Sequence, residues 1–358
     1  MGKKTPLYDL HVRLGGKIVE FGGFDLPVQY AQGIIAEHNV VRNSVGLFDV
    51  SHMGEFVIRG KNAAAALQTI VTNRVDTMKE GQCRYTLMLY EDGGIVDDLL
   101  IYKFDDEHFM LVVNAANIEK DFDWIYSHIG NMAEVSDISE QTALIALQGP
   151  NAEKVIAKLT DISLLPAKSY YFGRDINVGG KNCLVSTTGY TGEKGYEIFC
   201  APGDVVYIYK KLLAEGEAYG IEPAGLGARD TLRFESSMPL YGHELSAETK
   251  AHEVGLDAFI KYDVDFIGKD ALVAHPPKYE RIGLKLIDKG IAREHCDIFD
   301  EGGKLIGQTT SGGVCVTLGG SYAMARVVKG FLKDAFIDVR GRRLKAEITA
   351  MPFYKRGQ

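Results

Sequence analysis

The chain has 358 residues, 46% hydrophobic and 25% charged, which is the composition of an ordinary water-soluble globular protein. Its net charge of -8 argues against a general nucleic-acid-binding protein. No apolar run approaches the roughly 18 residues that cross a bilayer, so we expect no membrane segment. The five cysteines and nine histidines show neither disulfide nor metal-ligand spacing, and no signal peptide is evident. We therefore expect a cytoplasmic protein without a metal.

Residue patterns up to about residue 160 predict strands and helices in an irregular order. Glu91-Asp92-Gly93-Gly94 is a hairpin signal, and Asn114 is a residue type that caps helices. In chain order, the predicted elements are a strand at 54–60, a helix at 63–71, a hairpin of 84–90 with 98–104, a strand at 109–113, a helix from 114 to about 128, a strand at 143–148 and a helix from 149 to 159.

The second half begins in the same way and then changes character. Strands are predicted at 182–187 and 195–200, and helices at 204–215 and 224–235. After a proline-rich junction near residue 276, short strands and glycine-rich turns predict an all-β domain from about residue 280. The irregular mixture before that point favours an α+β fold over a doubly wound sheet.

Two blocks, 187–197 and 225–235, carry the strongest chemical signal. The first has glycine at every third position, which allows the backbone to approach a ligand closely, and it contains Tyr190 and Glu197. The second places Arg229 and Arg233 four residues apart, on one face of a predicted helix. A flat ligand with hydrogen-bond donors and carboxylates suits this set, although a plain hairpin and a solvated helix face are equally typical of such patterns.

A carboxylate pair follows the hairpin turn. Because side chains alternate along a strand, Asp98 shares a face with Tyr102, whereas Asp97 shares one with Leu99 and Ile101. Asp98 is therefore the better functional candidate, although both aspartates can simply finish a turn. Tyr85 is more typical of an ordinary strand aromatic, and Asn114 of a helix cap.

Taken together, these blocks resemble the glycine cleavage T-protein family of aminomethyltransferases. The similarity extends from Thr5 to Tyr354, and its main blocks occur in the order found in the family. They are residues 46–53, 93–99, 112–115, 147–150, 188–193, 225–230 and 240–242.

The resemblance implies a three-lobed fold around a central folate channel. Residues 5–270 would form two interleaved α+β lobes, the second at roughly 51–140, and residues 280–356 would form a C-terminal barrel. It also implies transfer of an aminomethyl-derived carbon from the lipoyl arm of H protein to tetrahydrofolate, with lipoate carried only by that partner. Asp98 would be the catalytic residue, and the folate-binding residues would be Tyr85, Asn114, Tyr190, Glu197, Arg229, Met53, Tyr102 and Arg356.

Departures from the family pattern leave two alternatives open. Cys315-Val316 replaces a usual Ser-Pro pair, His252 stands where proline is frequent, and 293–296 lacks the usual glycine-bearing turn. A folate-dependent transferase that uses another methyl or aminomethyl donor is one alternative, and a non-catalytic folate-binding relative is the other. Separately, residues 329–358 contain eight Lys or Arg against three Asp or Glu, which indicates either a solvated basic face or a docking surface for an acidic partner.

Overall fold

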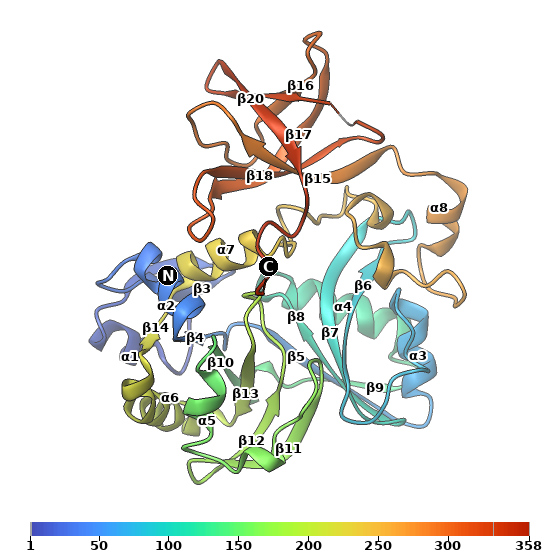
Figure 1. The fold of residues 1–358 in the computed structure, drawn as a ribbon. Coiled ribbons are helices and arrows are strands. Elements are labelled where there is room, and N and C mark those ends of the chain that lie inside the picture. Colours follow the sequence, from blue (N-terminus) through green and yellow to red (C-terminus); the bar gives the residue numbers. More distant parts are fainter. Residues whose placement is uncertain (1, 332, 358) are drawn as a thin grey trace. The chain divides into compact units, whose positions relative to one another are not determined.

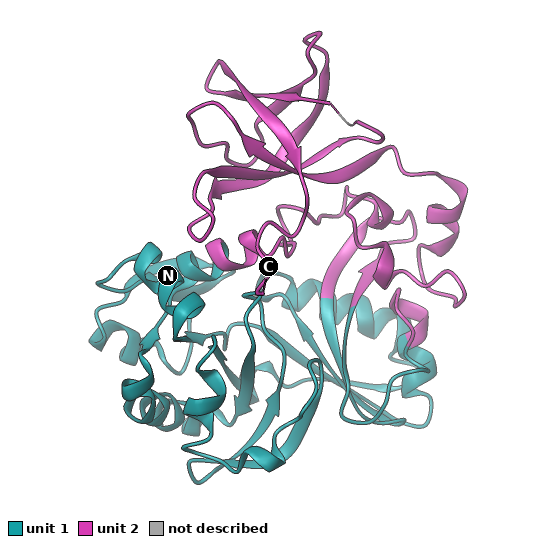
Figure 2. Cartoon of the chain, in the orientation of Figure 1, with its two compact units in different colours: residues 1–67, 75–85, 99–230 teal, residues 68–74, 86–98, 231–358 magenta. Residues whose placement is uncertain are grey.

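Residues 2–331 and 333–357 are described by a computed structural model, in which helices and strands follow one another irregularly (Figure 1). The chain forms two units, each assembled from separate stretches (Figure 2). Unit 1 contains residues 1–67, 75–85 and 99–230, and unit 2 contains residues 68–74, 86–98 and 231–358. Within the described ranges, no helix combines the length and apolar character needed to cross a membrane.

A six-stranded sheet provides the main core of unit 1. Its central strand, β10, is buried along its whole length because it pairs with strands on both sides. All neighbours are antiparallel except β14 and β4, which are parallel. The sheet order is β11 (Phe172–Val178), β12 (Lys181–Ser186), β13 (Gly195–Cys200), β10 (Ala143–Gln148), β4 (Val45–Asp49) and β14 (Ile221–Pro223).

Helix α6 (Pro202–Gly216) packs on one face of this sheet. Proline in its first turn removes no intrahelical hydrogen bond, so it favours the start of the helix. Val205, Ile208, Tyr209 and Leu212 recur at helical spacing and join the core formed by alternate residues of the strands. Shorter helices accompany the sheet, namely α1 (Tyr8–Arg13), α2 (Ile34–Asn43) and α5 (Ala152–Ile156).

Two further sheets complete the region before the barrel. One contains β1 (Lys3–Lys4), β3 (Phe24–Gln29) and β2 (Lys17–Phe21) in that order. The other has the order β6 (Cys83–Leu89), β7 (Ile95–Asp105), β8 (His108–Val113), β5 (Gly54–Arg59) and β9 (Glu134–Asp137), with helices α3 (Ala63–Ile70) and α4 (Ile118–Ile129) nearby in the chain. Residues 86–89 of β6 and 95–98 of β7 belong to unit 2.

The C-terminal part of unit 2 is a closed barrel. Alternate residues such as Ile282, Leu284 and Leu286 line its core, as the period of a strand requires. The barrel order is β15 (Tyr279–Leu286), β18 (Ser321–Val328), β17 (Leu305–Val314), β16 (Asp297–Phe299), β19 (Ala335–Val339) and β20 (Arg342–Thr349). Helix α8 (Lys269–Ala274) precedes it, and helix α7 (Leu226–Glu235) contributes its second half to unit 2.

The predicted α+β class and the all-β C-terminal barrel are confirmed. Two helix predictions were wrong in detail. Asn114 makes no side-chain cap, and the backbone first forms a 3₁₀ turn at Ala115–Asn117 before α4 begins at Ile118. The helix predicted from 149 to 159 has only the residues Ala152–Ile156, because the chain continues in turns after Ile156. The division into three lobes stays a prediction.

Candidate functional site

The glycine block forms the loop between β12 and β13, and a buried amide holds it. Gln148, at the end of β10, donates from Nε2 to the Thr188 carbonyl at 3.2 Å and accepts from the Thr191 hydroxyl at 2.9 Å. A Cβ on Gly189 would lie 2.1 Å from Gln148 Oε1, and one on Gly195 would lie 2.4 Å from the Leu147 carbonyl oxygen. Glycine is required at both positions because the loop lies directly against β10.

A buried ion pair anchors the far side of the same loop. Arg42 Nη1 donates to the Thr191 carbonyl at 2.7 Å and to Glu193 Oε1 at 2.9 Å. Both side chains are almost inaccessible, with 3% and 0% of their surface exposed. Because removal of one partner of a buried ion pair is strongly destabilising, the pair is a strong constraint on loop position.

Glu197 is the acidic group to which this loop leads. It lies on β13 directly opposite Ser186 on β12, so both side chains share one face of the sheet. Its carboxylate accepts a hydrogen bond from the Thr188 hydroxyl. Burial raises the pKa of Glu197, while the Thr188 hydrogen bond and the Arg229 charge oppose that rise. The residue keeps part of its surface accessible, so a ligand can still reach it.

Tyr190 and Arg229 are brought together in unit 1. The guanidinium of Arg229 lies 4.7 Å from the centroid of the Tyr190 ring, a cation–π arrangement. His52 is almost fully buried beside the Phe21 and Phe24 rings. It also interacts electrostatically with Arg229. Burial and the Arg229 charge lower the pKa of His52 to about 4, so its imidazole is neutral at pH 7.

The start of α7, which carries Arg229, is fixed by a buried carboxyl group. Glu37 accepts a hydrogen bond from the backbone N–H of Gly225 at 2.8 Å and another from that of Tyr30 at 2.5 Å. Gly225 approaches the chain so closely that a Cβ would lie 2.6 Å from the Val28 carbonyl carbon. Burial raises the pKa of Glu37, and the two backbone donors oppose the rise. Glu37 therefore positions the first turn of the helix from which Arg229 projects.

Tyr102 is fully buried, with 0% of its surface exposed. Its ring packs against Phe172 and Phe199, and its hydroxyl meets the hydroxyls of Ser186 and Thr188. A side chain without accessible surface cannot touch a ligand unless the protein rearranges. In this conformation Tyr102 contacts Thr188, which in turn contacts Glu197, and its predicted contact with folate stays a prediction.

The other predicted residues of unit 1 are all partly exposed. Tyr85 shares a face of β6 with Cys83, whose raised pKa reflects burial and the nearby Glu197 charge, so this face lies toward Glu197. Asn114 follows β8, and Met53 closes a turn through its backbone N–H to the Val50 carbonyl at 3.1 Å. These residues stay candidates for ligand contact.

Sequence reasoning missed Tyr170. The residue is 46% exposed and its backbone is left-handed, with φ of 61°. Burial of its hydroxyl and the nearby Glu197 charge raise the pKa of Tyr170. A non-glycine residue in this conformation is uncommon and is often found at binding sites. Thr188 stood within the recognised glycine block, but its role, like that of Arg42, depends on contacts across the chain that no local pattern reveals.

Asp98 lies in unit 2, on the first part of β7. Asp97 is fully buried and Asp98 is partly exposed, as expected if Asp98 is the one that faces a ligand. The preceding turn is held by the segment 241–251, because Tyr241 Oη donates to the Ile95 carbonyl at 3.2 Å and a Cβ on Gly94 would lie 2.0 Å from the Ala247 carbonyl oxygen.

Arg233 also lies in unit 2 and is not available to a ligand. Its side chain is 2% exposed and pairs with Glu244 at 2.9 Å and with the Ser311 hydroxyl at 3.1 Å. Arg229 and Arg233 therefore do not form a shared ligand-binding face, although their spacing places them on the same side of the helix. Arg356 is exposed near the C-terminus. Cys315, one of the departures from the family pattern, is buried with Phe234 and Tyr322, where a small apolar side chain fits.

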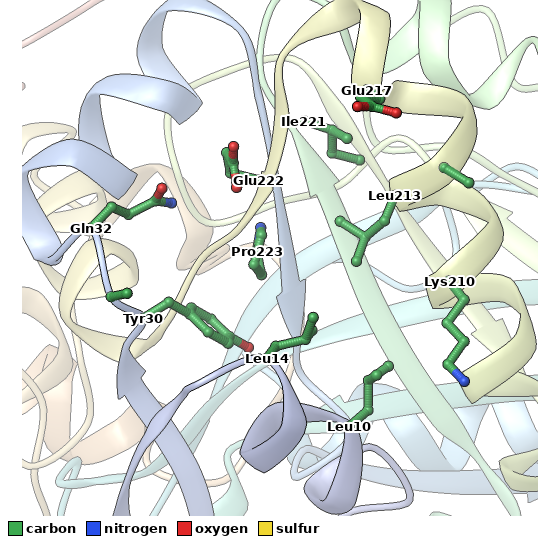
Figure 3. A pocket seen from close by; sticks show the side chains of 12 residues that line it. Leu10, Leu14, Tyr30, Gln32, Lys210, Leu213, Glu217, Ile221, Glu222 and Pro223 are labelled. Carbon is green, nitrogen blue, oxygen red and sulfur yellow. The ribbon is translucent and has the colours of Figure 1, made fainter.

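A cavity of about 600 Å³ in unit 1 lies among different residues (Figure 3). Leu10, Leu14 and Pro223 give it apolar walls, and Lys210 is at its edge. Its lining includes none of the predicted ligand-binding residues, so we do not assign it to the site. Among residues 2–331 and 333–357, no group of three or more His, Cys, Asp or Glu side chains is arranged to hold a metal ion.

Comparison with known proteins agrees with this architecture. The model of the GCVT N-terminal domain matches residues 7–264, and that of the glycine cleavage T-protein C-terminal barrel domain matches residues 280–355. This chain belongs to the glycine cleavage T-protein family.

Relatives within the glycine cleavage T-protein family match over their full length. An aminomethyltransferase of Geobacillus sp. (strain WCH70) is 47% identical, with 100% of each chain covered. The aminomethyltransferase of Bacillus subtilis (strain 168) is 42% identical, with 99% of this chain and 100% of the relative covered. The crystal structure of glycine cleavage system aminomethyltransferase T from Bartonella henselae superimposes with a TM-score of 0.91 at 31% identity, covering 99% of both chains.

The close packing of the glycine loop gives a stability prediction. We expect Gly195→Ala to lower the free energy of unfolding by about 1–3 kcal/mol, because its Cβ would meet the backbone of β10. Gly203→Ala is the matched control, since nothing lies within 4 Å of its added Cβ, and we expect unfolding free energy unchanged or raised by up to about 1 kcal/mol. Urea unfolding followed by circular dichroism measures both, and equal stability of the two variants would contradict the packing argument.

Proposed function

We propose that this chain catalyses the tetrahydrofolate-dependent aminomethyltransferase reaction of glycine cleavage. The donor is the aminomethyl group carried on the reduced lipoyl arm of H protein. The methylene carbon leaves the lipoyl sulfur and the amino nitrogen, and it forms new bonds to N5 and N10 of tetrahydrofolate. The two N–H protons lost by the folate balance the thiol and the ammonia that are released, and the product is 5,10-methylenetetrahydrofolate.

The observation that carries this proposal is the full-length match of both domains to aminomethyltransferases. The chemistry of unit 1 supports it. A carboxylate such as Glu197 can accept two hydrogen bonds from the donor edge of a pterin. The aromatic rings of Tyr170, which is exposed, and of Tyr190, which is partly exposed, are suited to pack on flat heterocycles, and Arg229 offers a positive charge to the carboxylates of the folate tail.

Asp98 supplies the catalytic carboxylate in this proposal. Transfer of the methylene carbon passes through an iminium-like species that carries positive charge, and a fixed negative charge stabilises it. Positioning of donor and acceptor together contributes most of the remaining acceleration.

One assay tests the proposal directly. Purified protein is mixed with aminomethylated H protein and tetrahydrofolate, and ammonia and 5,10-methylenetetrahydrofolate are measured. We expect ammonia release that depends on both substrates. Folate binding without turnover would favour the non-catalytic alternative, and turnover only with a different methyl or aminomethyl donor would favour the paralogue. Neither alternative is favoured by the relatives, whose names specify aminomethyltransferases.

The basic C-terminal segment gives a further prediction about the carrier. Arg342 is exposed at the start of β20, whereas the guanidinium of neighbouring Arg343 lies 4.2 Å from the Phe299 ring centroid and contributes to packing. We expect Arg342→Glu to raise the apparent KM for H protein at low salt, with a smaller difference at high salt, because surface charges act on association and are screened. The double reversal with Arg343→Glu should show a larger effect.

Steady-state kinetics at several salt concentrations measures this KM, with tetrahydrofolate affinity as an internal control that should not change. A KM for H protein that is insensitive to Arg342→Glu at every salt concentration would show that the carrier docks elsewhere.

A further inference from the structure

Three hydroxyl groups form a connected cluster behind Glu197 in unit 1. The Tyr102 hydroxyl lies 3.2 Å from that of Ser186 and 3.3 Å from that of Thr188. Ser186 Oγ and Thr188 Oγ1 are 2.6 Å apart, and Thr188 donates to Glu197 Oε2. All three residues are buried, with exposures of 0%, 0% and 5% for Tyr102, Ser186 and Thr188. The cluster is therefore shielded from water and touches the candidate ligand-binding carboxylate at one end.

The number of protons fixes the direction of these hydrogen bonds. Each hydroxyl group has one proton to donate. Thr188 uses its proton on Glu197, so its oxygen can only accept from Ser186 and Tyr102. Ser186 must then donate to Thr188, whereas the Tyr102 hydroxyl has three acceptors within reach, namely these two oxygens and the Cys83 sulfur. The O–H dipoles of Ser186 and Thr188 consequently both point toward the carboxylate, and aligned hydrogen bonds of this kind strengthen one another.

This direction favours the ionised form of Glu197. An ionised carboxylate only accepts, so it matches a donor at Thr188 and leaves its other oxygen sites for a ligand. A carboxyl group protonated at Oε2 would require the hydroxyl chain to reverse, and one protonated at Oε1 would accept a weaker hydrogen bond from Thr188 than the charged carboxylate does. The hydroxyl cluster therefore opposes the effect of burial, which by itself favours the neutral acid.

We infer that Thr188, with Ser186 and Tyr102 behind it, is a positioning residue that keeps Glu197 a pure hydrogen-bond acceptor, so that the site selects ligands whose edge presents two adjacent donors. The pterin edge of tetrahydrofolate has this chemistry, and the inference in this respect rests on the proposed function. A ring of similar shape with an acceptor at that edge would face lone pairs with lone pairs and be rejected.

The pH dependence of binding reports on this role. Other titratable groups also influence the ionisation of Glu197. Arg229 on α7 favours its charged form. The other groups that interact electrostatically with it are Glu55 on β5, Cys83 on β6, Tyr102 on β7 and Tyr170 before β11. Burial raises the pKa of each of these last four, which favours their neutral forms. Loss of the Thr188 hydrogen-bond donor should raise the pKa of Glu197 further. When the pH is lowered, the affinity for the ligand should therefore begin to fall at a higher pH than in the wild type.

The test is the dissociation constant of tetrahydrofolate for the full chain, measured anaerobically by titration calorimetry between weakly acidic and neutral pH. Thr188→Val keeps the shape of the side chain and removes its hydrogen-bond donor, and we expect the affinity for tetrahydrofolate to be about tenfold weaker at neutral pH. We also expect the acid limb, which is the fall in affinity on acidification, to move upward by about one pH unit. Thr188→Ser should restore both. Tyr102→Phe, which removes only the outermost hydroxyl, should shift the acid limb in the same direction by less.

Thr160→Val is the matched control, because the buried Thr160 hydroxyl makes no hydrogen bond within the described residues, and it should leave affinity and pH profile unchanged. If the wild-type chain does not bind tetrahydrofolate, the proposed function fails and this inference fails with it. If the wild type binds but Thr188→Val leaves the acid limb in place, or weakens binding equally at every pH, Thr188 is only structural and the inference alone is overturned.

Discussion

Replacement of Asp98 by asparagine should reduce turnover at least about 100-fold, the range typical of a lost charged catalytic group. The amide keeps the size of the side chain and removes its negative charge, so stabilisation of an iminium-like species is lost while packing is retained. Asp98 is partly exposed on β7, next to the fully buried Asp97, and is therefore the accessible member of the pair. Ammonia release at saturating H protein and tetrahydrofolate measures the effect.

Asp92→Asn is the matched control for this substitution. Asp92 lies in the turn before β7, has a side chain that is 69% exposed, and pairs with Lys250 at 2.7 Å. Surface ion pairs contribute little, so we expect turnover close to that of the wild type. Wild-type turnover in Asp98→Asn would remove Asp98 from the mechanism and show that another group stabilises the iminium-like species.

Replacement of Glu197 by glutamine should weaken tetrahydrofolate binding by about 1–3 kcal/mol, because the new amide N–H₂ would face the donors of the pterin edge or of Thr188. Loss of the charge should also change the pH profile. The pKa of Glu197 is raised by burial, so acidification protonates it earlier than an ordinary glutamate, and wild-type affinity should fall as pH drops through that raised pKa.

The Glu197→Gln variant has no charge to lose, and its affinity should lack this acid limb. Glu222→Gln, an exposed position on β14, is the control and should bind as the wild type does. Titration calorimetry gives both results. Equal affinity of Glu197→Gln and wild type across the pH range would show that the pterin edge is held by another group.

Local patterns were sufficient wherever the deciding interaction is close in sequence. The Glu91-Asp92-Gly93-Gly94 turn predicted the β6–β7 hairpin, and β7 begins three residues before the predicted boundary because Ile95 is already held by the backbone of Ser246. Asn114 shows the limit, since a good capping residue was followed by a 3₁₀ turn instead of a side-chain cap. Helix ends depend on small differences in energy that tertiary contacts easily outweigh.

The sequence by itself determined the α+β class, the C-terminal barrel and the family, because hydrophobic period, turn residues and ordered motif blocks are all properties of short stretches. It also singled out Tyr190, Glu197 and Arg229 as chemically notable. Only the tertiary structure decided that Arg229 stacks on Tyr190, that Arg233 forms a buried ion pair with Glu244, and that the buried Tyr102 hydroxyl contacts that of Thr188. Helical or strand spacing fixes which face a side chain leaves from, whereas burial and hydrogen-bond direction are set by residues far away in the chain.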